Sequence, residues 1–132
     1  MTNRLYEIIE SHEENNYLFE IIQSDNQMGV RCKVNVSYEN LFEKQLEKYE
    51  KSKYKSLFEK SLNDRFVKKE IYKFESLVWC WPNDEFNFEI GKKLSKERVN
   101  NLIKNKMNKI KRFIRHLERY NTKTMKYEKG AN

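Results

Sequence analysis

The sequence has little of what most catalytic and cofactor sites require. Its 132 residues include three glycines, one proline, two cysteines and two histidines. Three separated glycines cannot form a glycine-rich loop around phosphates. No apolar run approaches the roughly 18 residues of a membrane span, and residues 1–10 lack the charged-then-apolar layout of a signal peptide. We therefore expect a cytoplasmic protein with no membrane partner.

The few cysteines and histidines form no reactive or metal-binding pattern. Cys32 and Cys80 each lie alone in an apolar, strand-like stretch, and we interpret both as small buried hydrophobic residues. A structural disulfide is not expected in a reducing compartment. His12 and His116 fall in separate predicted helices with no nucleophile motif beside them. These residues predict neither a metal site nor a cofactor, and we expect His116 at the surface.

The remaining catalytic candidate is a nuclease-like set of two acids and a lysine. It would consist of Asp84, Glu89 and Lys92. Glu89 and Lys92 are three residues apart, so on a strand their side chains would point to opposite faces. The fit is poor, and we predict a protein that is not an enzyme.

Alanine is also nearly absent, which bears on the origin of the gene. Ala131 is the single alanine, whereas there are twenty lysines and fifteen asparagines. Lys, Asn, Ile, Tyr and Phe are encoded by A/T-rich codons. This bias is typical of phages and mobile elements of low-GC bacteria, and we expect such an origin.

The aromatic content predicts a folded chain despite its many charges. Aromatic residues make up 14% of the sequence and apolar residues 38%, too much for a disordered protein. The length suits one core. We expect a single domain over residues 1–120 and a mobile basic tail over residues 121–132, where no periodicity is visible.

The first third of the chain predicts a helix and a hairpin. Apolar residues at helical spacing in Asn3–Glu14 predict a short amphipathic helix. Tyr17–Ile22 is rich in strand-forming residues, and Val30–Val36 alternates apolar and polar without interruption. The turn-forming residues between them predict an antiparallel hairpin.

Residues 38–72 lack glycine and proline and predict helix. The sequence Leu41–Leu46 nearly recurs at Leu57–Leu62, sixteen residues later. Sixteen positions rotate a straight helix by roughly 160°, so the two copies would face nearly opposite sides. We therefore expect a break within residues 50–53 and two helices. One long helix is the alternative, and a homodimer built on this region is a further hypothesis.

The last third predicts a second hairpin and a long helix. Leu77–Trp81 is an apolar run, and Phe86–Ile90 alternates again after turn-forming residues. Ser95 lies where an N-cap would begin the last helix. The element order α-ββ-α(α)-ββ-α predicts an α+β fold: a four-stranded antiparallel sheet from two hairpins, with helices packed on one face.

Charge is divided unevenly along the chain. The segment from Lys92 to Asn132 holds fourteen Lys or Arg and three acids, a net charge of +11, whereas residues 1–91 sum to −4. Such a split indicates a polyanionic partner for the basic end.

The last helix combines an apolar stripe with a basic face. From Ser95 to Tyr120 the apolar residues fall on one arc of roughly 140° at about 100° per residue. The opposite arc is cationic and nearly free of acids, although like charges at i,i+4 destabilise a helix by a few tenths of a kcal/mol per pair. The candidate binding residues on this helix are Arg98, Lys104, Lys109, Lys111, Arg112, Arg115 and Arg119. Secondary candidates are Arg31, Lys33, Lys92 and Lys93.

Three further positions carry open alternatives. The phase of Lys106 places it inside the apolar stripe, where it either extends along the apolar surface to solvent or pairs with an acid from residues 1–91. Trp79 and Trp81 share one face of a predicted strand. Such rings, with those of the next strand, either pack in the core, which we favour, or form a stacking surface for single strands.

These observations predict a non-enzymatic protein that engages nucleic acid or a nucleoprotein complex through the basic helix. Cations set against phosphates release counterions and give affinity without base recognition. The alternative is a phage or mobile-element inhibitor of a host defence protein, of the anti-CRISPR or anti-defence type, acting by protein–protein contact. The sequence does not distinguish DNA, RNA and protein as the partner.

Overall fold

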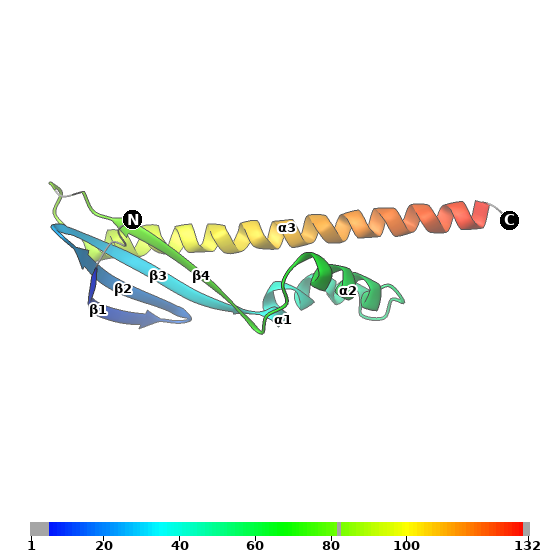
Figure 1. The fold of residues 1–132 in the computed structure, drawn as a ribbon, viewed down its shortest axis with the longest axis horizontal. Coiled ribbons are helices and arrows are strands. Elements are labelled where there is room, and N and C mark those ends of the chain that lie inside the picture. Colours follow the sequence, from blue (N-terminus) through cyan, green and yellow to red (C-terminus); the bar gives the residue numbers. More distant parts are fainter. Residues whose placement is uncertain (1–5, 82, 131–132) are drawn as a thin grey trace. The chain divides into compact units, whose positions relative to one another are not determined.

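The computed structural model describes residues 6–81 and 83–130, with side chains up to Asn121. It confirms the α+β class and the four-stranded antiparallel sheet, in which the strand order is β1-β2-β3-β4 (Figure 1). The chain divides into two compact units. The first comprises Met1–Val36 and Ile71–Ile103, and the second comprises Ser37–Glu70 and Lys104–Asn132. The expectation of a single domain over residues 1–120 stays a prediction.

The first three strands form a meander in the first unit. They are β1 (Glu7–Glu14), β2 (Tyr17–Ser24) and β3 (Gln27–Ser37). Two-residue turns join them, and the first residue of each turn, Asn15 and Asp25, has a positive φ of 56° and 53°. Asn and Asp tolerate this left-handed region better than most residues. The hairpin predicted from Tyr17–Ile22 and Val30–Val36 is confirmed, with β2 and β3 paired antiparallel.

The helix predicted over Asn3–Glu14 is wrong for its described part. Glu7–Glu14 is an edge strand paired antiparallel with β2, and all eight of its residues are exposed. The spacing of Ile8 and Ile9 therefore does not mark a buried helical stripe. The tight turn at Asn15 and Asn16 brings this segment back against β2, where pairing satisfies the backbone hydrogen-bonding groups on one side of β1. Residues 3–5 lie outside the described residues.

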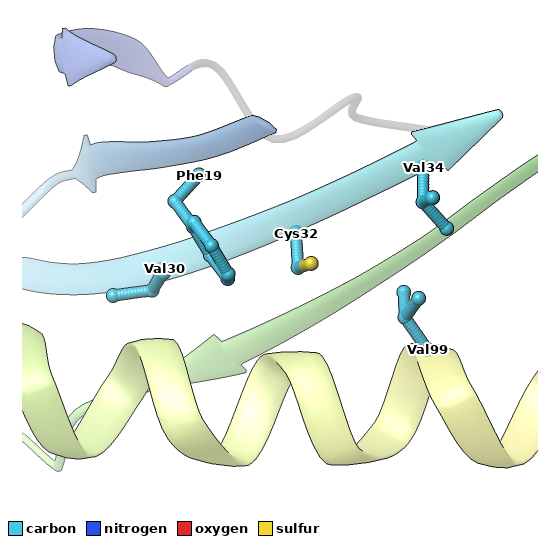
Figure 2. Packing of buried hydrophobic residues seen from close by; sticks show 5 residues of the cluster. All are labelled: Phe19, Val30, Cys32, Val34 and Val99. Atoms are coloured by element: carbon cyan, nitrogen blue, oxygen red, sulfur yellow. The ribbon is translucent and has the colours of Figure 1, made fainter. Parts of the chain in front are cut away.

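The core of the first unit lies between the sheet and the long helix α3 (Phe88–Gly130). Phe19 of β2 and Val30, Cys32 and Val34 of β3 pack with Val99 of α3. Figure 2 shows these five side chains filling the space between strand and helix. Residues two apart on a strand share a face, so the alternation in β3 selects this side for α3.

The second hairpin predicted from Leu77–Trp81 and Phe86–Ile90 is wrong. β4 (Ile71–Trp79) lies beside β3, but the residues expected to form its hairpin partner lead into α3. The Oδ1 of Asn87 accepts a hydrogen bond from the backbone N–H of Ile90 at 3.2 Å and caps this helix. The sheet is therefore a meander completed by β4, and Ser95 is not the N-cap.

Ser95 instead lies buried within α3 and anchors it to the sheet. Its carbonyl accepts a hydrogen bond from the Oγ of Ser76 in β4 at 2.5 Å. β4 also approaches β3 closely, since a Cβ added at Gly29 would lie 2.8 Å from the Trp79 ring and 2.8 Å from the carbonyl oxygen of Val78. Glycine at position 29 permits this approach.

Three short helical elements belong to the second unit. They are α1 (Tyr38–Leu41), the 3-10 helix η1 (Glu43–Tyr49) and α2 (Lys55–Arg65). The predicted break within residues 50–53 is confirmed, because turn residues separate η1 from α2. The break allows equivalent positions of the near-repeat to be buried together: Phe42 with Phe58, and Leu46 with Leu62. The helix predicted over 38–72 ends at Arg65, before β4 begins.

The backbone of α3 continues to Gly130, through most of the segment that we expected to be a tail. The helix supplies residues up to Ile103 to the first unit and residues from Lys104 onward to the second. The mobility of residues 121–132 stays a prediction, and residues 131–132 lie outside the described part of the chain.

Candidate functional site

The part of α3 in the second unit has one buried and one charged face. Ile110 and Ile114 are buried, and the Phe113 ring packs edge-on against Phe66 with ring centroids 5.9 Å apart. This contact with the segment after α2 fixes the rotation of the helix about its axis. The opposite face is therefore directed to solvent.

Six exposed cations occupy that opposite face, and we call them the cationic ridge. None of the six lies within ion-pairing distance of a carboxylate among the side chains that the structure describes. Their positions span an arc of roughly 160° at about 100° per residue. The cationic ridge consists of Lys104, Lys109, Lys111, Arg112, Arg115 and Arg119.

The charge asymmetry along the chain is also an asymmetry between the two compact units. The second unit contains nineteen Lys or Arg and nine acids, a net charge of +10, and the first unit carries −3. Cations from η1 and α2 thus add to those of α3 in the second unit. Strong like charge in one compact unit raises the local concentration of anionic ligands.

A groove between η1 and α3 adds cations from a second element. We call it the η1–α3 groove. Its volume is about 430 Å³, and Ile114 is the apolar residue in its lining. Four cations and one acid line it, so the groove is strongly positive. Its lining residues are Lys44, Gln45, Glu47, Lys48, Lys111, Ile114 and Arg115.

Glu118 is the counter-charge of one groove cation, Lys48. Its carboxylate accepts a hydrogen bond from the Tyr49 hydroxyl, and its Oε2 lies 3.4 Å from the Nζ of Lys48. The hydrogen bond from Tyr49 lowers the pKa of Glu118 most, burial opposes this, and Lys48 lowers it further. Glu118 therefore stays ionised and holds Lys48 beside α3.

Arg98 does not join the cationic ridge. It belongs to the first unit, where its guanidinium donates a hydrogen bond to the carbonyl of Leu77 in β4 at 3.0 Å. This contact ties α3 to the sheet. Arg98 is therefore in part a structural residue, which the helical phase alone did not reveal.

The secondary cations also lie in the first unit, and most of them have acidic partners. The Nε of Arg31 lies 2.8 Å and the Nζ of Lys33 lies 3.3 Å from the same oxygen of Glu20. Lys92 lies 2.9 Å from Glu14 and 3.1 Å from Glu89. Three of the four thus have internal counter-charges, and the other, Lys93, is exposed.

Lys106 faces away from the cationic ridge. Its Nζ lies 4.8 Å from the centroid of the Phe66 ring, and the residue is half-buried. Burial lowers the pKa of Lys106, and the charges of Lys109 and Lys69 lower it further. Of the two expectations, extension along an apolar surface fits this position. Among the described side chains no carboxylate pairs with it.

The histidines and cysteines occupy ordinary structural positions. His12 lies 2.9 Å from Glu10, and its ring centroid lies 4.9 Å from that of Phe88. His116 is exposed on α3, as expected. Burial raises the pKa of the Cys32 thiol to about 11, which agrees with a buried apolar role. Cys80 is only half-buried, and its Sγ lies 3.6 Å from the carbonyl of Trp81.

The described residues contain no group of three or more His, Cys, Asp or Glu able to hold a metal ion. The nuclease-like set is placed differently from our expectation, because Glu89 and Lys92 lie on α3 rather than on a strand. On a helix, residues three apart share a face, and these two form an ion pair. Their charges are thereby satisfied with each other and with Glu14.

The aromatic residues divide between packing and exposure. Trp79 lies against Gly29, while Phe86 and Phe88 pack against the core of the first unit. Trp81 is 75% exposed. The preferred core interpretation therefore holds for Phe86 and Phe88, whereas Trp79 is half-buried beside Gly29 and Trp81 is exposed.

Lys44 and Lys48 were not singled out from the sequence. They stand in a segment of mixed sign, which usually indicates a solvated surface. Their importance comes from the tertiary placement of η1 beside α3 within the second unit, and the sequence carries no local signal for that placement.

Comparisons with known protein families, with curated proteins and with solved structures found no match for this chain. Among the described residues, no helix is long and apolar enough to cross a membrane. The candidate site is therefore defined by its own geometry and charge.

Proposed function

We propose that this protein is a non-enzymatic, cytoplasmic binding protein that engages nucleic acid or a nucleoprotein complex through the cationic ridge. The observation that supports the proposal is the set of six exposed Lys and Arg side chains on one face of α3, without carboxylate partners among the described residues. A solvated helix normally mixes signs, because opposite charges four residues apart stabilise it. The cationic ridge gives up that stabilisation, which an anionic partner would restore.

The proposed binding is electrostatic and tracks the phosphate backbone. Each cation placed against a phosphate releases about one counterion, so log K falls linearly with log salt. Six contacts correspond to a slope of about −4 to −5. Arginine is well suited to this role because its guanidinium can contact two phosphate oxygens at once.

The test is charge reversal on the cationic ridge. In fluorescence anisotropy with labelled single-stranded DNA, duplex DNA and RNA, we expect Arg112→Glu, Arg115→Glu and Arg119→Glu together to abolish binding. The matched control reverses three exposed lysines elsewhere: Lys51→Glu, Lys60→Glu and Lys73→Glu. If both triple variants weaken binding equally, net charge alone explains it, and if neither does, the proposal is wrong.

The triple variant must retain its fold for this test to hold. Circular dichroism should show unchanged helix content, since the three arginines are exposed. If charge reversal unfolds the protein, the binding test uses the neutral triple variant Arg112→Gln, Arg115→Gln and Arg119→Gln in its place. A loss of helix with this milder set as well would show that the arginines serve the fold.

A second candidate function is inhibition of a host defence protein by a phage or mobile element. The observation that favours it is β1, whose exposed Ile8 and Ile9 lie among glutamates. An acidic strand with exposed apolar side chains suits a protein partner and repels nucleic acid. A pull-down from host lysate with and without nuclease distinguishes the two functions, because only a protein-directed inhibitor keeps its partner after nuclease treatment.

A further inference from the structure

We propose that the η1–α3 groove binds a phosphate group of the nucleic-acid backbone, so that η1 forms the second wall of the binding site. This inference rests on the proposed function and adds a specific place and two residues to it. Lys44 and Lys48 of η1 would contact the phosphate from one side, and Lys111 and Arg115 of α3 from the other.

The first argument is the convergence of cations from two elements. Lys111 and Arg115 are four residues apart on α3 and therefore neighbours on one helical face. Lys44 and Lys48 reach the same hollow from η1. Four like charges around one site repel each other, and of the four only Lys48 has a carboxylate partner, Glu118, among the described side chains. An anion held among them would remove the repulsion.

The second argument is the segregation of acids in η1. Most carboxylates of this region line a neighbouring hollow, which shares Lys44 and Glu47 with the η1–α3 groove, so Glu47 is the one acid among the groove's lining residues. That hollow is lined by Glu39, Glu43, Leu46, Glu47, Glu50 and Glu59 with Lys44 and Lys55. Glu47 is the acid common to both. The sign of the charge therefore differs between the two hollows beside η1.

The third argument is size and chemistry. A volume of about 430 Å³ lies within the range of small-ligand sites, roughly 300–1,000 Å³. It accommodates a phosphate with its sugar rather than the width of a duplex. Arginine and lysine together provide a fork and a point charge, which is the combination used for phosphate recognition.

The experiment compares three paired neutralisations in the full chain, using labelled oligonucleotides. Lys44→Gln with Lys111→Gln removes the groove cations, Arg112→Gln with Arg119→Gln removes cationic-ridge residues outside the groove, and Lys51→Gln with Lys60→Gln is the matched control. We expect the groove pair to weaken binding and to reduce the salt slope by about 1.4–1.8, because each neutralised cation that faces a phosphate accounts for about 0.7–0.9 of the slope. The control pair should leave the affinity and the salt slope unchanged.

Each result separates this inference from the proposed function. If the residues outside the groove matter and the groove pair behaves like the control, the groove is not a phosphate site, although the proposed function stands. If the unmodified protein binds no oligonucleotide at low salt, the proposed function fails and the groove assignment fails with it. Poly-L-glutamate is the further probe: binding as tight as that of the oligonucleotide, with equal dependence on Lys44, would overturn the assignment to phosphate.

The single variant Lys44→Gln tests whether a loss of binding comes from a loss of stability. Lys44 is exposed and lies outside the buried core of the second unit, so the urea midpoint of this variant should match that of the unmodified protein. A variant that keeps its stability and shows a salt slope smaller by about 0.7–0.9 supports the assignment. One that keeps both its stability and the full slope contradicts it.

Discussion

The carboxylate of Glu20 on β2 accepts a hydrogen bond from the Nε of Arg31 on β3 at 2.8 Å, and both side chains are largely buried, at 7% and 12% exposure. Glu20 and Arg31 face each other directly in the register of the two strands. They lie on the side of the sheet opposite Phe19 and therefore opposite the core that contacts α3. This pair explains why the cations of the first hairpin form no free binding surface.

Replacing Glu20 with glutamine should destabilise the fold. The change leaves Arg31 buried beside a neutral amide, and losing a hydrogen bond between charged groups costs about 1.5–3 kcal/mol. Urea denaturation should show a lower midpoint with an unchanged slope. Glu13→Gln, at an exposed position of β1, is the control and should match the unmodified protein. Equal midpoints for the Glu20 variant and this control would contradict the structural role.

The contribution of Glu20 should also depend on pH. Burial raises its pKa, but the hydrogen bonds and charges of Arg31 and Lys33 outweigh this and lower the pKa below the usual 4.5. A carboxyl with a lowered folded-state pKa contributes its stability above the unfolded pKa and loses it as pH falls through the folded one. The difference in unfolding free energy between the unmodified protein and Glu20→Gln should therefore shrink below about pH 4.5. A constant difference down to about pH 2 would exclude this linkage.

Two lysines on α3 show whether binding depends on the face of the helix that carries a charge or only on the total charge. Lys104 belongs to the cationic ridge, whereas Lys106 lies over the Phe66 ring. We expect Lys104→Met to weaken oligonucleotide binding and reduce the salt slope by about 0.7–0.9. Lys106→Met should leave binding unchanged. If the two variants weaken binding equally, total charge matters and the face does not.

The stability of the Lys106 variant provides a second measurement. A cation over an aromatic ring contributes about 0.5–1 kcal/mol, and a methionine sulfur beside a ring contributes about 0.3–1.5 kcal/mol. Methionine also avoids the desolvation that lowers the lysine pKa. We therefore expect the unfolding free energy to change by less than about 1 kcal/mol in Lys106→Met. A larger loss in urea denaturation would show that the ammonium group itself stabilises the second unit.

Removing Glu118 should tighten binding. Glu118 pairs with Lys48 and would compete with a phosphate for this cation of the η1–α3 groove. Glu118→Gln should steepen the salt slope by about 0.7–0.9. Glu70→Gln removes the same charge from an exposed position in the second unit and should have a smaller effect. Identical affinities for the two variants would show that Glu118 does not compete with the ligand.

The parts of the fold that the sequence predicted well are those with a strong local period. The strict alternation of Val30–Val36 identified a strand, and the sixteen-residue near-repeat required a break that the turn after Tyr49 provides. The apolar stripe of α3 likewise matched the burial of Ile110 and Ile114. In each case a buried face imposes its own repeat on the sequence.

The secondary-structure predictions that were wrong fall in segments where burial imposes no regular apolar pattern on the sequence. β1 is exposed along its length, so Ile8 and Ile9 matched a helix by chance, and the Asn15 turn was the better signal. Phe86 and Phe88 resemble alternating strand residues, but the Asn87 cap between them begins a helix. An apolar residue at the first turn of a helix and one in a strand look alike over so few positions.

The candidate site was predicted in the part that one helix contains. The cationic ridge, from Lys104 to Arg119, follows from helical phase alone, whereas Arg98 contacts Leu77 instead. The lysines of η1 could not be found, because their meaning depends on which element lies opposite. Local sequence encodes the face of a helix, but the partner of that face is a property of the folded unit.

The exposed edge of β1 has a consequence for the behaviour of this protein at high concentration. An unpaired strand edge is a template on which another chain can add, and charged side chains are a common means of preventing this. Glu7, Glu10, Glu13 and Glu14 provide such a barrier along an otherwise open ladder. Two identical edges repel each other at neutral pH. Salt screens such repulsion between exposed charges, and storage of the purified protein is therefore safest at low ionic strength.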